Sequence, residues 1–163
     1  MKTFKNPGSG KMRKLYALIF AILLTISCAL NVSASESMTT KQNIIFHDDG
    51  SYSVIIIEVQ EARTSSSKVG TKTYLHYSAN NVLQWSAVLR GMFHFDGTSA
   101  TCTSSVCDVT IHNTEWNVVS KNVRTSGNSA LADLKMNRVY SGIVTETKTV
   151  NLSLSCDANG NLS

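Results

Sequence analysis

The chain has 163 residues and a formal net charge of +4 at pH 7, with 15 Lys and Arg against 11 Asp and Glu. Five of the basic residues and none of the acidic ones precede residue 35, so residues 35–163 carry ten basic and eleven acidic side chains, a net charge of −1. A chain of this length forms one domain with its own core, and without an excess of positive charge it lacks the basic surface on which nucleic acid binding depends.

Residues 1–34 have the pattern of a secretory signal peptide. Five Lys and Arg residues precede the uncharged apolar run Leu15–Ile26, and Val32-Ser33-Ala34 places small residues at the −3 and −1 positions of a cleavage site. We expect a leader helix, cleavage after Ala34 and a secreted product that then leaves the membrane. The alternatives are an uncleaved N-terminal membrane anchor and a lipoprotein attached through Cys28, although Thr25 stands where a lipobox usually has Leu.

A polar and unpatterned segment, residues 35–42, is expected to be a flexible lead-in to a domain spanning residues 43–163. The first strands are predicted over residues 43–46 and Tyr52–Val59, with turn-forming residues at 47–50 between them. Three consecutive Ile residues in the second of these strands favour burial on both faces, and a helix over this segment is the alternative.

The stretch Val82–Cys102 has the clearest pattern of the chain. Apolar or small residues occupy every odd position from Leu83 to Phe95, which is typical of a strand with one buried face, so Trp85 should face the core and Gln84 the polar side. Asp96-Gly97 is the dipeptide most typical of a two-residue type I′ hairpin turn. Such a turn would pair Phe95 with Thr98, Phe93 with Ala100, and Gly91 with Cys102.

Further strands are expected on both sides of this hairpin, with no helix after residue 63. Residues 63–70 predict a loop, and Ser104-Ser105 predicts a second turn. The remaining strands are expected over Thr71–Tyr77, Val106–His112, Trp116–Val123, 130–137 and Ile143–Cys156, with turns at Ser126–Asn128 and Ser141-Gly142. Short alternating strands between turns are typical of an antiparallel β-sandwich, Ig-like in order or an open barrel.

Three cysteines follow the predicted leader: Cys102, Cys107 and Cys156. In an oxidising compartment two of them are expected to form a disulfide. A turn at Ser104-Ser105 would place Cys102 opposite Cys107. A Cys102–Cys156 bridge would instead close a loop of about fifty residues, worth roughly 4 kcal/mol, and Gly91 would leave room for it. The third cysteine is expected to be buried and inert.

The second half of the chain resembles short secreted proteins of Gram-positive bacteria whose role is uncharacterised. The matching pieces are Trp85, Gly91-Met92-Phe93, Asp96-Gly97, the run SATCTSS from Ser99, Trp116, SGNSA from Ser126 and the ending SCDANGNLS from Ser155. The resemblance implies export and an all-β domain. It also implies the Cys102–Cys156 pairing, because those two cysteines belong to the shared pattern and Cys107 does not. It implies no catalytic residue.

No metal or cofactor site is predicted. The spacing of the histidines fits no zinc motif, so we expect them on polar surface faces; they are His47, His76, His94 and His112. The segment Asp157–Asn161 copies the start of a calcium-binding loop, but Leu162 stands in place of the required glycine, which favours a tight turn.

A catalytic role is not predicted either. No serine, cysteine or histidine motif of a known hydrolase is present, and the carboxylates that could serve a glycosidase lie beside turns or on polar faces; they are Asp108, Glu115 and Asp133. Trp85 is expected in the core, whereas Trp116 follows a turn and is the candidate contact residue for a ligand.

The sequence therefore favours a secreted, non-enzymatic binding or interaction domain, whose partner is a protein or a cell-surface glycan. A small secreted effector, such as a bacteriocin-like toxin or an enzyme inhibitor, is the alternative. A hydrolase with an unrecognised site comes third.

Overall fold

The computed structural model describes residues 38–60 and 66–163, in which strands and turns occur without a helix. The strands are β1 (Met38–Phe46), β2 (Tyr52–Gln60), β3 (Ser67–Tyr77), β4 (Leu83–Phe95), β5 (Ala100–Ile111), β6 (Trp116–Ser126), β7 (Ser129–Tyr140) and β8 (Ile143–Ser155). Within these ranges no helix is long and apolar enough to cross a membrane. The predicted leader, its cleavage site and Cys28 lie outside the described residues.

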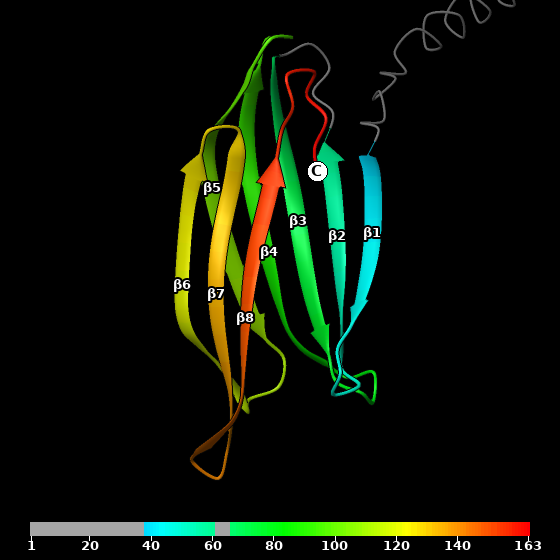
Figure 1. Ribbon diagram of the computed structural model, residues 1–163, viewed down its shortest axis with the longest axis vertical. Coiled ribbons are helices and arrows are strands. Elements are labelled where there is room, and N and C mark those ends of the chain that lie inside the picture. The colour runs from blue at the N-terminus through cyan, green and yellow to red at the C-terminus, as the bar shows by residue number, and fades with distance from the viewer. Residues whose placement is uncertain (1–37, 61–65) are drawn as a thin grey trace, which may run out of the picture. The chain divides into compact units, whose positions relative to one another are not determined.

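Within each sheet the strands pair antiparallel in sequence order, β1-β2-β3-β4-β5 in one sheet and β6-β7-β8 in the other, and β5 does not pair with β6. The second sheet lies over β3, β4 and β5, and β1 and β2 extend beyond it (Figure 1). The predicted all-β antiparallel class is confirmed. The Ig-like strand order is not found, because Ig-like sandwiches contain Greek-key connections and both sheets here are simple meanders.

The core lies between the two sheets, on the faces that the alternating pattern predicted. Inward side chains of β4 meet those of β7, and those that are fully buried are Trp85, Ala87, Leu89, Phe93, Ala130, Ala132, Leu134 and Met136. From β8, Leu152 and Leu154 complete the second layer. In β2, Ile55 and Ile57 are partly buried and pack against the core, and on the other face Val54 is buried and Ile56 is partly buried, so each face is covered in part.

The β4–β5 hairpin forms at the predicted place but not with the predicted turn. Phe95 pairs with Ala100 and Phe93 with Cys102, so the reversal uses four residues, 96–99. A type I′ turn needs positive φ at both central residues, and of Asp96 and Gly97 only the glycine has it, at 86°. The Asp96 carboxylate instead accepts the backbone N–H groups of Thr98 and Ser99 at 2.9 and 2.7 Å, which stabilises the wider turn. The register moves by two residues, and the buried face is therefore preserved.

The predicted turn at Ser104-Ser105 is wrong, because β5 continues through it and pairs with β4 along its whole length. A bulge lies at Thr103, whose hydroxyl donates to the carbonyl of Met92 at 3.1 Å. The extra residue lets both Cys102 and Cys107 face the core from one strand. The space beside Gly91 holds the Phe93 ring, which would lie 2.5 Å from an added Cβ, and Cys102 lies opposite Phe93 and not opposite Gly91, so the glycine does not make room for the predicted disulfide.

Two predicted irregular segments are partly strand. β1 begins at Met38, within the predicted lead-in, and β3 begins at Ser67, within the predicted loop. Residues 35–37 and 63–65 of those segments lie outside the described residues. The predicted turn at 47–50 is found: the N–H of His47 donates to the carbonyl of Ser51 at 2.9 Å, and Gly50 has a φ of 76°.

The predicted turns at Ser126–Asn128 and Ser141-Gly142 are both found, and Ser126 pairs with Ser129 across the first of them. Ser141 and Gly142 have φ of 52° and 80°, the pattern of a type I′ turn, and join β7 to β8. After β8 the chain turns back once more, and Leu162 forms an isolated bridge with Cys156 and is buried. This C-terminal hairpin, residues 156–162, touches the β4–β5 turn, since the N–H of Gly97 donates to the carbonyl of Ala158 at 2.9 Å.

Candidate functional site

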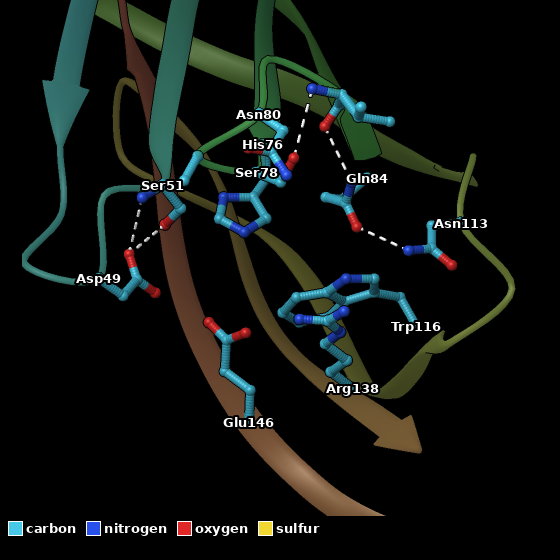
Figure 2. A pocket seen from close by; sticks show the side chains of 12 residues that line it. Asp49, Ser51, His76, Ser78, Asn80, Gln84, Asn113, Trp116, Arg138 and Glu146 are labelled. Atoms are coloured by element: carbon cyan, nitrogen blue, oxygen red, sulfur yellow. Dashed lines mark hydrogen bonds between the residues drawn. The ribbon is translucent and has the colours of Figure 1, made fainter. Parts of the chain in front are cut away.

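A pocket of about 510 Å³, lined by both polar and apolar side chains, opens at the end of β4 away from the β4–β5 turn. Three turns surround it: the β1–β2 turn contributes Asp49 and Ser51, the β3–β4 turn residues 78–80 and 82, and the β5–β6 turn Asn113. Strand residues close it: His76, Gln84, Trp116, Arg138 and Glu146. Figure 2 shows side chains from both sheets pointing into this space.

A β-bulge directs Gln84 into the pocket. His76 pairs with Trp85 and Tyr77 with Leu83, so Gln84 has no partner on β3. Bulges redirect side chains, and Gln84, which alternation places on the polar face, is 5% exposed. Its amide Nε2 donates to the carbonyl of Val82 at 2.9 Å, and its Oε1 accepts the side-chain amide of Asn113 at 2.8 Å. The side chain is therefore held at both ends.

Trp116 lines the pocket but is not the exposed residue that its position after a turn suggested. It is 4% exposed and packs edge-on against His76, with ring centroids 5.4 Å apart. Its Nε1 has no hydrogen-bond partner within the described residues. A buried N–H without an acceptor costs about 1–3 kcal/mol, so a ligand that accepted from it would recover that free energy. Its suggested role as a contact residue stays a prediction.

The charged side chains that line the pocket, Asp49, Arg138 and Glu146, form ion pairs with Lys148 and Glu115 beside it. Lys148 Nζ lies 3.0 Å from Asp49 Oδ2 and 3.0 Å from Glu146 Oε1. Arg138 binds Glu115 through its Nη2 at 2.7 Å. The Ser51 hydroxyl and the Lys148 ammonium hold the pKa of the Asp49 carboxyl well below its usual range, so this carboxylate is ionised at neutral pH.

His76 forms the floor of the pocket and is 1% exposed, so the expectation of surface histidines is wrong for it. His94 and His112 are exposed. Burial, and then the nearby charge of Lys148, lower the pKa of His76 to about 4, which keeps the ring neutral.

A buried hydroxyl lies behind this ring, in a network that the sequence did not predict. Ser53 Oγ lies 3.5 Å from His76 Nδ1, 2.9 Å from His47 Nε2 and 2.6 Å from the Tyr74 hydroxyl. Ser53 is fully buried and, unlike Trp116, does not line the pocket, so its hydroxyl is out of reach of a ligand there. These hydrogen bonds join β2 and β3 behind the site. We therefore assign Ser53 and His76 a structural role and not that of a nucleophile and its general base.

The carboxylates considered from the sequence are engaged in ion pairs and are not gathered at one site. Asp108 lies 3.6 Å from Arg90, Asp133 pairs with Arg124, and Glu115 holds Arg138 beside the pocket. The Asp157 carboxylate accepts the N–H groups of Asn159 and Asn161 in its own turn. Over residues 38–60 and 66–163, no three His, Cys, Asp or Glu side chains are placed to hold a metal ion.

The cysteines lie far along the strands from the pocket, and all three that the structure describes are buried free thiols. The predicted Cys102–Cys156 bridge is not formed; the thiols donate instead to the carbonyls of Ser104 and Asp157 at 3.3 and 3.4 Å. The entropy of closing a long loop favoured the Cys102–Cys156 pair in the sequence analysis, but that argument does not determine in which direction either thiol points. The alternative Cys102–Cys107 pair is excluded as a cross-strand bridge, because both residues lie on β5.

Most of this site could not be derived from the sequence. Trp116 and Asn113 were visible as a tryptophan and a turn residue, but the pocket depends on the bulge at Gln84 and on the approach of three turns. No family model, curated protein or solved structure matches the chain, so the site stands on its geometry.

Proposed function

We propose that the protein is a secreted, non-enzymatic binding domain whose ligand site is the pocket beside Trp116. The observation that carries this proposal is the buried, unpartnered Nε1 of Trp116 in a pocket of about 510 Å³. Pockets for small molecules span roughly 300–1,000 Å³ and combine aromatic walls with a few fixed polar groups. Gln84 and Asn113 are such groups, since they bind each other and the backbone.

Export is part of the proposal and rests on the leader pattern of residues 1–34 and on the resemblance to secreted Gram-positive proteins. A secreted domain with a fixed pocket meets its ligand outside the cell or at the cell surface. In that setting we also propose that Cys102 and Cys156 become oxidised to a disulfide.

A ligand screen on the purified product of the full chain tests the proposed site. Isotope-labelled protein is mixed with a panel of neutral, cationic and anionic metabolites while the backbone amide resonances are followed. We expect at least one compound to move the resonances of Gln84 and Asn113 and to leave that of Asn122, an exposed residue of β6, in place.

A matched pair of variants controls this screen. Asn80 is exposed, lines the pocket and makes no hydrogen bond within the described residues, so Asn80→Ala should weaken binding without disturbing the fold. Asn122→Ala should change nothing. A panel that leaves the pocket resonances unmoved contradicts the site, and conversion of a bound compound contradicts the non-enzymatic role. Growth inhibition that survives Asn80→Ala would support the effector alternative instead.

A further inference from the structure

The pocket is poorly suited to a strongly charged ligand. Its two carboxylates, Asp49 and Glu146, share Lys148, and its guanidinium, Arg138, is bound to Glu115. A phosphate would find no uncommitted Lys or Arg among the residues lining the pocket, and it would lie beside two carboxylates. A strong cation would have to compete with Lys148. The paired charges therefore favour a ligand without net charge.

The remaining polar groups offer donors and acceptors together. An amide side chain has two N–H bonds and two lone pairs, and Gln84 uses one N–H on Val82 and one lone pair on Asn113. Trp116 adds an N–H donor without a partner, and the Asn80 side chain adds both kinds of group. A hydroxyl group donates and accepts at once, so several hydroxyls on one ligand match this mixture better than carbonyls or amines alone.

Apolar and aromatic surface lies next to these groups. The rings of Trp116 and His76 meet at 5.4 Å, and Val82 and Ala79 lie along the same pocket. Figure 2 shows the Trp116 ring on the side opposite Asp49 and Ser51, with Gln84 above it. Such a surface suits a ligand whose ring carries hydroxyls at its edge and C–H groups on its face.

From these three features we infer that the pocket takes a neutral, polyhydroxylated ring, that is, a mono- or disaccharide unit. The inference rests on the proposed function, because it names the ligand class of the same pocket. Gln84 and Trp116 hold the hydroxyls, Asn80 closes the site from the β3–β4 turn, and the Lys148 and Arg138 ion pairs exclude charged sugars.

The tryptophan indole resonances report directly on this site. The chain has two tryptophans, Trp85 and Trp116, and Trp85 is buried in the core, also without a partner for its Nε1, but does not line the pocket. Trp116→Phe and Trp85→Phe assign the two indole signals and form a matched pair. The probes are glucose, galactose, mannose, N-acetylglucosamine, cellobiose, maltose, lactose and chitobiose, with glucosamine and glucuronic acid as charged counterparts.

We expect a neutral saccharide to move the Trp116 indole signal and not that of Trp85, and to bind more tightly than its charged counterpart. Trp116→Phe should weaken that binding about fivefold, the effect of one hydrogen bond, while Trp85→Phe should not. Asn80→Ala should also weaken saccharide binding, and Asn122→Ala should not. Because both residues are exposed, this pair tests the site even if the two tryptophan variants are destabilised.

Two negative results are distinguishable. If no saccharide moves the Trp116 signal but another class of metabolite does, the inference about sugars is overturned and the proposed binding function stands. If nothing moves it, both are overturned. Equal binding of a neutral sugar and glucuronic acid would contradict the role of the paired charges.

Discussion

His76 is a neutral histidine held between the two sheets by its neighbours. The Ser53 hydroxyl lies behind the ring, and Trp85 and Trp116 contact it with ring centroids 5.4 Å away in each case. The titratable groups nearby are Lys148, Asp49 and His47, of which Lys148 and His47 lower the pKa of His76 and Asp49 raises it. Burial dominates, and the pKa of about 4 lies below the ordinary value of 6.5.

This residue predicts a loss of stability in mild acid. The folded-state pKa is lower than the unfolded one, so the contribution of His76 is complete above pH 6.5 and is lost as the pH falls towards 4. At about 1.4 kcal/mol per pKa unit, the free energy of unfolding should fall by about 3 kcal/mol over that interval. Urea unfolding at a series of pH values measures it. His76→Gln should flatten the slope between pH 6.5 and 4, and an unchanged slope would contradict the assignment.

For individual residues, the sequence predicts on which face of a strand a side chain lies, but it does not predict which side chain of the other sheet packs over it. Alternation puts Tyr74 and His76 on one face of β3, and both are buried. Nothing in the local sequence indicates that Trp116, from the other sheet, closes over His76. Gln84 was assigned to the wrong environment because one inserted residue reverses the parity on which the assignment depends.

Among the elements, hairpins were predicted best where the turn residues alone determine the reversal. Ser141-Gly142 forms the expected two-residue turn, with positive φ at both residues, and no other segment that the structure describes lies within 4 Å of a Cβ added at Gly142. Asp96-Gly97 has a stronger dipeptide signal, but the Asp96 carboxylate accepts two N–H groups and Gly97 binds Ala158, and these contacts widen the turn. A dipeptide rule does not include contacts with a segment sixty residues away in the chain.

The C-terminal hairpin should contribute measurably to stability through Leu162. This side chain is 3% exposed and belongs to the core cluster. Leu162→Ala should lower the free energy of unfolding by about 2 kcal/mol, the lower end for buried leucines, because Leu162 is held by an isolated bridge to Cys156 and not within a strand, so the segment around it can relax. Ile143→Ala, at a position that is 68% exposed, is the control and should change it little. Equal denaturation midpoints for both variants would show that the hairpin is not part of the cooperative unit.

For the whole molecule, the β6–β7 turn holds the two sheets together beside the cysteines. It accepts a backbone hydrogen bond from each of the two cysteines of the proposed bridge: the N–H of Cys102 donates to the carbonyl of Gly127 at 2.8 Å, and the N–H of Cys156 donates to that of Asn128 at 3.0 Å. Cys102 also raises the pKa of Cys156, after the larger effects of burial and Asp157. These contacts bring the two thiols to one end of the sandwich.

If the protein is exported as we propose, we expect it to contain a Cys102–Cys156 disulfide and a free Cys107. Mass spectrometry of a non-reduced digest identifies the pair, and reduction should lower the free energy of unfolding by roughly 4 kcal/mol, as for a loop of about fifty residues. Cys107→Ser should keep this dependence on reductant, and Cys156→Ser should abolish it. Three unmodified thiols in the exported protein would contradict the prediction.

The fold class followed from the sequence because repeated alternation and frequent turns leave few other arrangements. The assignment of strands to two sheets did not, since the break between β5 and β6 looks like any other turn. That break determines where the pocket forms, which is why the site is harder to predict than the strands that build it.

The pairing of strands in sequence order within each sheet has a consequence for how the protein is made. Each hairpin needs only residues already present when its second strand appears, so a polypeptide that emerges from a translocation channel N-terminus first is able to assemble the larger layer strand by strand. Residues of the last three strands cover the apolar face of β3, β4 and β5 and line the pocket, so neither the core nor the pocket is complete until these strands are in place.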